Sequence, residues 1–239
     1  MAPTHLAFDL YGTLLDTSSI KTALENLLPN DQKPLATHIV QDWRKHQLEY
    51  TWRLTSMGVY KDFSTVTLLS LRNALQDSGV SIPDLLTDKL IHAYDYLSLF
   101  PDAEPLLRAL EASPEFMATV FSNGTPAQLE TSIHQSHGLK DSVFASSNLP
   151  YVSVDAVKRF KPAPEVYWHL LGQLGLSTDE ASKVVLVSGN PFDIVGAGAV
   201  GMKTVWVDRE GRGWRDGLGA PDKVVKSLEE VVKWVKDEK

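Results

Sequence analysis

Short apolar runs alternate with longer amphipathic segments along most of this chain. The apolar runs at 6–10, 118–122, 143–145, 184–188 and 204–207 have the length and composition of buried β-strands. Helical patterns accompany the later runs, near 126–137, 164–174, 192–200 and 228–236. Alternating strands and helices predict an α/β fold, with a Rossmann-like parallel sheet and helices on both of its faces.

The segment 17–97 departs from this alternation, because it holds helix-length amphipathic stretches and no convincing strand. The stretches lie at 35–57, 66–75 and 85–96, with glycine or proline between them. We therefore predict a helical cap domain over 17–97, inserted into a catalytic core made of 1–16 and 98–239. The chain is expected to re-enter the core near 98–101, and 209–221 is expected to be a loop.

Composition and charge narrow the possible functions. The chain has 239 residues, of which 43% are hydrophobic and 22% charged, which is enough apolar content for a real core. Its net charge is -7 and it has no basic run, so nucleic acid is not an expected partner. A negatively charged protein that binds an anion must gather positive groups locally.

The residue types that are absent also exclude chemistry. With no cysteine, the chain has no disulfide, no thiol nucleophile and no cysteine-ligated zinc. Its histidines are scattered, and His134 and His137 are interpreted as helix-surface residues rather than a metal pair. Neither a signal-peptide pattern nor a membrane-spanning apolar stretch is evident, so we expect a cytoplasmic protein with no membrane partner.

The first strand ends in a carboxylate. Residues 7–16 read AFDLYGTLLD, so Asp9 follows the apolar run and Gly12 lies where the chain must turn. Ligands of open α/β sheets bind at the carboxyl ends of the strands, which makes Asp9 a candidate nucleophile. The alternative is that Asp9 only caps a turn or helix.

Two later segments carry candidate polar groups. Residues 120–126 read VFSNGTP, a strand end followed by hydroxyls, a glycine and a proline that starts a helix. Free N–H groups there favour an anion, although Ser122 or Thr125 would serve equally well as a plain helix cap. Lys161 precedes a proline in an extended segment and can reach Asp9, where its charge would keep the carboxylate ionised. The alternative is a solvated lysine, as we interpret Lys158 and Arg159.

In order and spacing, these segments resemble the haloacid dehalogenase superfamily. The cap sequence at 43–52, WRKHQLEYTW, is similar to a helix of its L-2-haloacid dehalogenases, and the resemblance extends from the first strand to about residue 208. Superfamily phosphatases have a general-acid Asp where Tyr11 stands here and a magnesium-ligating Asp where Gly189 stands. The resemblance therefore implies an enzyme that uses no metal and no other cofactor.

The segment at 185–193, VLVSGNPFD, resembles the dehalogenase pattern Ser-Ser-Asn-x-x-Asp, with Gly189 in place of the second serine. Asp193 has the alternative interpretation of a carboxylate that complements a helix dipole. The resemblance implies catalytic roles and substrate-binding roles for two sets of residues. The catalytic set is Asp9, Thr13, Arg44, Lys161, Asn190 and Asp193, and the substrate-binding set is Leu10, Tyr11, Ser122, Asn123, Phe63, Tyr167, Ser188 and Phe192.

The resemblance also implies a reaction. It is the hydrolysis of (S)-2-haloalkanoic acids to (R)-2-hydroxyalkanoic acids and halide, through an ester on Asp9, with the 2-haloacid and the halide as small-molecule partners. A homodimer is implied by resemblance alone. Two alternatives share much of the site: a superfamily phosphatase, and a non-catalytic ligand-binding or interaction protein on the same scaffold. Tyr11 and Gly189 count against the phosphatase, and the full set of charged residues counts against the non-enzyme.

Overall fold

A six-stranded parallel sheet forms the centre of the protein, as a computed structural model describes it for residues 4–135 and 138–238. The order across the sheet is β3-β2-β1-β4-β5-β6. The strands are β1 (Thr4–Phe8), β2 (Phe116–Ser122), β3 (Tyr151–Ser153), β4 (Val184–Ser188), β5 (Lys203–Val207) and β6 (Lys223–Val225). The predicted α/β class with a Rossmann-like parallel sheet is confirmed.

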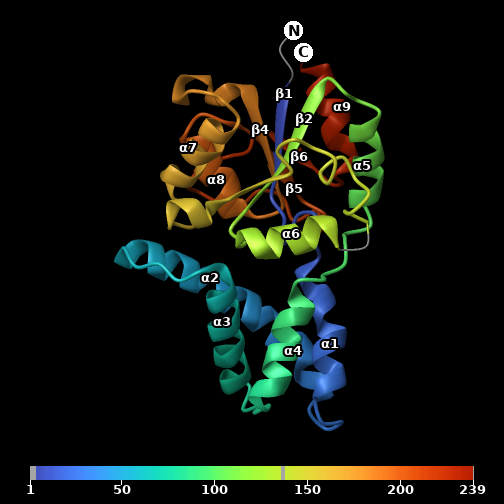
Figure 1. The fold of residues 1–239 in the computed structure, drawn as a ribbon, viewed down its shortest axis with the longest axis vertical. Coiled ribbons are helices and arrows are strands. Elements are labelled where there is room, and N and C mark those ends of the chain that lie inside the picture. Colours follow the sequence, from blue (N-terminus) through green and yellow to red (C-terminus); the bar gives the residue numbers. More distant parts are fainter. Residues whose placement is uncertain (1–3, 136–137, 239) are drawn as a thin grey trace.

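Helices cover both faces of this sheet and form a separate group below it (Figure 1). In Figure 1, α7 and α8 lie on one side of the sheet and α5 and α9 on the other. The α-helices are α1 (Lys21–Leu27), α2 (Ala36–Met57), α3 (Phe63–Asp77), α4 (Asp84–Tyr94), α5 (Ala103–Glu111), α6 (Pro126–His134), α7 (Pro164–Gln173), α8 (Pro191–Ala199) and α9 (Glu229–Asp237). Short 3-10 turns are η1 (Thr17–Ile20), η2 (Lys33–Leu35), η3 (Val154–Val157) and η4 (Thr178–Lys183).

Helices α1 to α4 stand beyond the carboxyl ends of the strands (Figure 1). They have a core of their own, in which the Trp43 ring centroid lies 5.1 Å from that of Tyr94 and the Trp43 indole donates to the Thr67 carbonyl at 2.9 Å. The two chain connections to the sheet run side by side, since the Asp16 N–H donates to the Ser98 carbonyl at 2.8 Å. These contacts support our proposal that 17–97 forms a cap domain.

Local sequence explains where several helices begin and end. Asp62 starts α3 by accepting the Thr65 N–H at 2.8 Å, and Thr125 with Gln128 forms a capping box at the start of α6. Helix α2 ends at Gly58, whose φ of 67° is a left-handed conformation that glycine adopts without strain. The predicted cap helices are thus present, and the stretch 209–221 contains no helix or strand, as expected.

The prediction of a strand at 143–145 is wrong. That stretch forms turns, and the strand beside β2 is β3, which begins at Tyr151. Phe144 is fully buried against Phe8, at a ring-centroid distance of 5.7 Å. An apolar run indicates that its residues are buried, and here the residues are buried in a turn rather than in a strand.

Other differences concern short elements. The short edge strand β6 and helix α5 were not predicted, and α6 ends at His134, before residues 136 and 137, which lie outside the described residues. His137 is therefore not described, whereas His134 is exposed, as predicted, and its Nε2 lies 3.7 Å from Glu130 Oε1. In the described part of the chain, every helix is too short or too polar to span a membrane.

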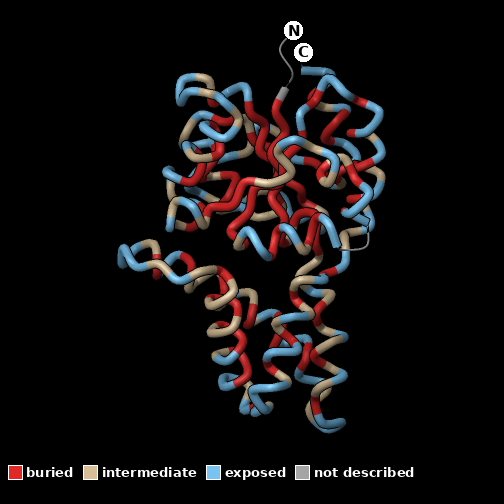
Figure 2. Tube along the Cα trace, viewed as in Figure 1, coloured by how far each residue is buried: buried red, intermediate tan, exposed pale blue. Residues whose placement is uncertain are grey.

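The strand order brings the site together. The chain runs outward from β1 through β2 to β3, then crosses back to place β4 on the other side of β1. Parallel sheets bind ligands where the order reverses in this way, at the carboxyl ends of the strands. Figure 2 shows that the chain is buried along the strands up to this end. Asp9 directly follows β1, and Ser188 ends the neighbouring strand β4.

Candidate active site

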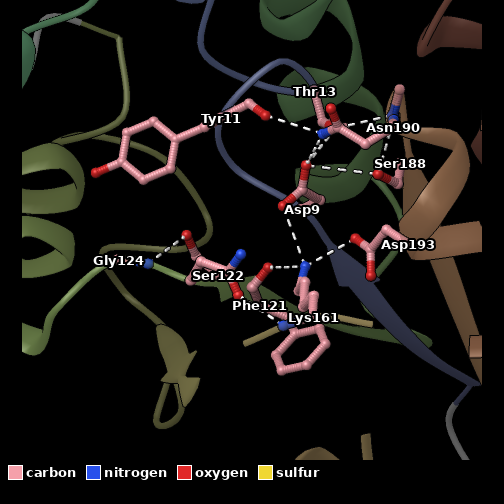
Figure 3. A network of polar contacts seen from close by, with 12 residues as sticks. Asp9, Tyr11, Thr13, Phe121, Ser122, Gly124, Lys161, Ser188, Asn190 and Asp193 are labelled. Carbon is pink, nitrogen blue, oxygen red and sulfur yellow. Dashed lines mark hydrogen bonds and ion pairs between the residues drawn. The ribbon is translucent and has the colours of Figure 1, made fainter. Parts of the chain in front are cut away.

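The carboxylate of Asp9 lies at the centre of a network of polar contacts (Figure 3). Only 6% of this residue is exposed. Its Oδ2 accepts hydrogen bonds from Thr13 Oγ1 at 2.8 Å and Asn190 Nδ2 at 2.7 Å, with Ser188 Oγ further away at 3.4 Å. Its Oδ1 lies 3.1 Å from Lys161 Nζ. The sequence-predicted residues around Asp9 are therefore in direct contact with it.

The turn after β1 brings Thr13 back toward Asp9. The Leu10 carbonyl accepts the N–H groups of Thr13, Leu14 and Leu15 at 3.2, 3.0 and 2.9 Å. Gly12, with φ of 85°, supplies the left-handed residue that this tight turn requires. The Leu10 side chain is fully buried in the core, so the substrate role predicted for this residue depends on its backbone N–H.

Lys161 is a buried ammonium held by two carboxylates. The residue is 1% exposed, and its Nζ donates to Asp9 Oδ1, to Asp193 Oδ2 at 2.8 Å and to the Phe121 carbonyl at 2.7 Å. Its charge also lies 4.1 Å from the centroid of the Phe121 ring. The Lys161 N–H donates to Asn123 Oδ1 at 3.0 Å, which ties the lysine segment to the end of β2. A buried cation is stable only when it is paired in this way.

Asp193 and Tyr167 complete the buried side of the network. Asp193 is fully buried, and the Tyr167 hydroxyl donates to its Oδ1 at 2.8 Å. Burial raises the pKa of Asp193 to about 6, while Lys161 lowers it and the charge of Asp9 raises it. Burial also holds the pKa of Tyr167 well above its usual range, so this hydroxyl stays a neutral donor.

Asn190 occupies the N-cap of α8, but its side chain makes no capping bond. Instead its Nδ2 donates to Asp9 and, at 3.0 Å, to the Tyr11 carbonyl. The Asn190 backbone N–H is bound by Ser188 Oγ at 3.0 Å, and Pro191 starts the helix in a position that needs no N–H donor. The asparagine amide is therefore used for the site rather than for the helix.

Arg44 reaches this network from α2. Its Nη2 donates to the Tyr11 carbonyl at 3.1 Å and to Asn190 Oδ1 at 3.3 Å, and its Nη1 donates to Gln47 Oε1 at 2.8 Å. Gln47 is fully buried and also binds Thr67 Oγ1, at 2.8 Å. Sequence reasoning missed Gln47 as a support for Arg44, although a glutamine on the apolar face of an amphipathic helix is a usable signal.

The remaining predicted residues lie around the network. The Tyr11 ring stacks on Phe63 with 5.4 Å between centroids, and Ser122 Oγ accepts the Gly124 N–H at 3.1 Å (Figure 3 shows the Ser122 bond). Phe192, on α8, packs against the end of the helical group. Its ring meets that of Trp52 on α2 edge-on, with 5.5 Å between the ring centroids.

Gly189 departs from the dehalogenase pattern, and close packing explains why. A Cβ on this residue would lie 2.5 Å from the Gly12 carbonyl oxygen. The Gly189 N–H donates to Thr13 Oγ1 at 2.9 Å, which holds the turn after β1 against the end of β4. In this chain, the glycine permits that close approach.

We expect Gly189→Ala to push the turn after β1 away from β4. Because the Cβ would overlap a backbone oxygen, the free energy of unfolding should fall by about 1–3 kcal/mol, and any Asp9-dependent activity should fall with it. The matched control is Gly198→Ala on α8, where a Cβ meets nothing within 4 Å. That control should be neutral, or stabilising by about 0.5–1 kcal/mol, since alanine favours a helix. Urea unfolding of both variants checks the prediction, and equal stabilities would contradict it.

The donor set around Asp9 does not suit a divalent cation. Both buried carboxylates, Asp9 and Asp193, face the ammonium of Lys161, which repels a metal ion. Across residues 4–135 and 138–238, no group of three or more His, Cys, Asp or Glu side chains is arranged to hold a metal ion.

Comparisons with known proteins agree with this architecture. A family model described as haloacid dehalogenase-like hydrolase matches residues 3–201. The chain is 34% identical over 233 residues to (S)-2-haloacid dehalogenase H-109 of Pseudomonas putida, covering 97% of each protein. It is 37% identical over 204 residues to (S)-2-haloacid dehalogenase 1 of Pseudomonas sp. (strain CBS-3), covering 84% of this chain and 83% of the relative.

A solved structure is also similar to this chain. It is that of L-2-haloacid dehalogenase from Xanthobacter autotrophicus with chloropropionic acid covalently bound, at 29% identity and a TM-score of 0.85, covering 98% of each chain. The sequence matches and the shared fold lead to one conclusion: this chain belongs to the haloacid dehalogenase-like hydrolases, in the family of the (S)-2-haloacid dehalogenases.

Proposed function

We propose that this protein hydrolyses (S)-2-haloalkanoic acids to (R)-2-hydroxyalkanoic acids and halide, without a metal ion or other cofactor. The observation that carries the proposal is the buried Asp9 carboxylate, held between Lys161 and Asn190 at the carboxyl end of β1. The structural relative with chloropropionic acid covalently bound supports a covalent route. A carboxylate that attacks carbon divides one difficult displacement into two easier steps.

In the first step, an oxygen of Asp9 attacks the carbon that carries the halogen. The new C–O bond forms on the side opposite the halogen, the carbon–halogen bond breaks with its electron pair, and the configuration inverts. Halide leaves toward the guanidinium of Arg44, which is permanently charged and weakly hydrated. Asn123 and Phe192 line the halide side in this proposal, and the Arg44 bonds to Tyr11 and Asn190 support this orientation of the guanidinium.

The carboxylate of the substrate binds near Ser122, with the N–H groups of Leu10 and Tyr11. Ser122 ends β2 beside Asp9, and the residues after it lead into the N-terminus of α6, where free N–H groups favour an anion. The aromatic wall formed by Tyr11 and Phe63 supports this side of the site.

In the second step, water attacks the ester carbonyl carbon of Asp9. Asp193 with Asn190 positions the water, Asp193 accepts its proton, and Lys161 stabilises the negative charge that develops on the carbonyl oxygen. The bond between the Asp9 carbonyl carbon and the alkoxy oxygen then breaks, and the departing alkoxide takes the proton from Asp193. Each Asp193 oxygen accepts one of the hydrogen bonds described above, from Lys161 or Tyr167, and so retains a lone pair for water. The hydroxyl oxygen of the product comes from Asp9, and the oxygen of water remains in the restored carboxylate.

The test of this function is halide release from (S)- and (R)-2-chloropropionate, each with EDTA present. Release from the S form alone, with (R)-lactate as product, is the expected result. Activity that disappears with EDTA and returns with magnesium would contradict the metal-free mechanism. If neither substrate released halide and the protein hydrolysed phosphate esters in the presence of magnesium, the protein would instead be a phosphatase.

We expect hydrolysis of the aspartyl ester to slow as the pH falls through the pKa of Asp193, because the base must be ionised. In the free protein burial raises this pKa to about 6. Esterification removes the charge of Asp9, so the pKa in the intermediate should be lower than in the free protein. Ester decay after rapid mixing with limiting substrate, followed against pH, measures it. An acid limb above the free-protein value would contradict this assignment of Asp193.

A homodimer and a cytoplasmic location are further parts of the proposal. Exposed apolar side chains near the end of α2, among them Met57 and Val59, support a subunit contact. Light scattering of the purified protein gives its molar mass, and cell fractionation gives its location.

A further inference from the structure

The loop after α2 contacts the segment that leads to Lys161. The Tyr60 hydroxyl donates to Asp155 Oδ1 at 2.5 Å. The Tyr60 ring stacks on Phe160, with 5.2 Å between centroids and an interplanar angle of 28°. These two contacts join the proposed cap to the residue immediately before the lysine that holds Asp9.

A second pair of contacts involves Thr55, in the last turn of α2. The Thr55 carbonyl accepts a hydrogen bond from Arg159 Nη1 at 2.6 Å, and Thr55 Oγ1 accepts the Phe160 N–H at 3.3 Å. Sequence reasoning placed Arg159 among surface residues, but here it is partly buried and bound to the helical group. We call Thr55, Tyr60, Asp155, Arg159 and Phe160 the latch.

The backbone of residues 155–160 includes one strained conformation. Lys158 has φ of 57°, a left-handed conformation that non-glycine residues seldom adopt. Its Nζ donates to Asp155 Oδ2 at 2.8 Å and lies 4.8 Å from the centroid of the Tyr60 ring. Lys158 therefore secures the Asp155 carboxylate that Tyr60 binds, and both act on the same short segment.

Beyond the latch, the contacts continue into the site in two directions. Phe160 packs near Phe63, which stacks on Tyr11. The residue after Phe160 is Lys161, whose Nζ reaches both Asp9 and Asp193. None of the latch side chains takes part in the proposed chemistry, yet each bears on the backbone that carries the lysine.

We propose that Tyr60, Thr55 and Arg159 are positioning residues: by fastening the end of α2 to residues 155–160, they set where Lys161 stands between Asp9 and Asp193. This inference rests on the proposed function for its kinetic consequences. It adds that docking of the helical group on the sheet domain and positioning of Lys161 occur together. When the helical group is not docked, Asp9 and Asp193 lack the cation that they share.

The test compares Tyr60→Phe with Tyr50→Phe. The first variant keeps the ring on Phe160 and loses only the bond to Asp155. The second removes a tyrosine hydroxyl that bonds Asn73 within the helical group, at 3.2 Å. We expect Tyr60→Phe to lower kcat for (S)-2-chloropropionate by about threefold to tenfold, with KM changed less than about twofold, and Tyr50→Phe to change neither.

A pH profile separates positioning from a merely structural role. Asp193 faces Lys161, Asp9 and Tyr167, and a displaced ammonium would lower its pKa less. The acid limb of kcat should therefore move upward in Tyr60→Phe and stay in place in Tyr50→Phe. Arg159→Met should reproduce the loss of kcat, and Arg159→Lys should recover part of it. Identical kcat and limb positions in Tyr60→Phe and Tyr50→Phe would overturn the inference.

Hydrogen exchange of the substrate-free proteins keeps this inference separate from the proposed function. The amides of Phe160 and Lys161 donate to Thr55 Oγ1 and Asn123 Oδ1. They should exchange faster in Tyr60→Phe than in Tyr50→Phe, whether or not the protein releases halide. Equal exchange rates of these amides in the two variants would contradict the proposed positioning role of Tyr60. A wild-type protein that is inactive on the haloacid but shows the exchange difference would overturn the proposed function alone.

Discussion

Asp9→Asn is expected to lower halide release at least about 10⁴-fold, the largest loss of activity that we predict. An amide of nearly the same shape fills the site but cannot attack carbon. The variant should fold, because Thr13 Oγ1 can still donate to the amide oxygen that replaces Asp9 Oδ2. Halide release from (S)-2-chloropropionate, measured by ion chromatography, gives the rate.

The matched control for Asp9→Asn is Asp208→Asn. Asp208 also follows a parallel strand directly, here β5, and is also buried, with its carboxylate bound by the N–H groups of Arg212 and Gly213. That change should cost stability while turnover stays within about threefold of wild type. Equal halide release by Asp9→Asn and wild type would refute Asp9 as the nucleophile.

Single turnover in H₂¹⁸O tests the same assignment by a different observable. Because water attacks the ester carbonyl in the proposed mechanism, the label should enter the carboxylate of Asp9 and not the first molecule of product. Label in that first product would indicate direct attack of water on the haloacid, which would remove the covalent step.

The fold class and the position of Asp9 could be predicted from the sequence because their signals are local. An apolar run followed by Asp9 identifies a strand and the residue at its end, and the same holds for Ser188 after the run at 184–188. Parallel strands all present their carboxyl ends at one edge, so residues far apart in sequence converge there without further information. Roles for Thr13, Asn190 and Asp193, like those for Arg44 and the other cap residues, came from family resemblance instead.

Contacts between distant segments were not predictable in this way. The burial of Gln47, the bond from Arg159 to the Thr55 carbonyl and the close approach of Gly189 to Gly12 depend on how α2 and the turn after β1 dock. The run at 143–145 shows the converse, since its apolar residues correctly indicate burial but do not specify the backbone. Periodicity reports which side of an element is buried, and it does not report the partner.

Lys161→Met is expected to have the second large effect, on stability as well as activity. The change removes a 1% exposed ammonium and leaves Asp9 and Asp193 buried without their cation. Breaking a buried ion pair in this way costs about 3–5 kcal/mol of unfolding free energy. Halide release should fall by about 10²–10⁴-fold, because the base Asp193 then retains its proton to higher pH and both carboxylates lose the cation that they share.

The stability loss in Lys161→Met should grow with pH, which distinguishes lost charge from lost packing. Burial already raises the pKa of Asp193 to about 6 in the wild type, and without the ammonium it should rise further. A carboxyl group whose pKa is higher in the folded state than in the unfolded state destabilises the protein. This loss of unfolding free energy is smallest below the unfolded-state pKa, and it increases as the pH rises through the folded-state pKa. Urea unfolding should therefore show a larger gap from wild type at about pH 8 than at about pH 5.

The control for this pH dependence is Lys45→Met, which removes an exposed lysine next to Arg44. Its stability should stay within about 0.5 kcal/mol of wild type at both pH values, because a solvated charge interacts weakly with its surroundings. If Lys161→Met lost the same free energy at both pH values, its cost would come from packing against Phe121 and not from the lost ion pairs. A gap that widens with pH would assign the loss to the two carboxylates, the groups on which both steps of the proposed reaction depend.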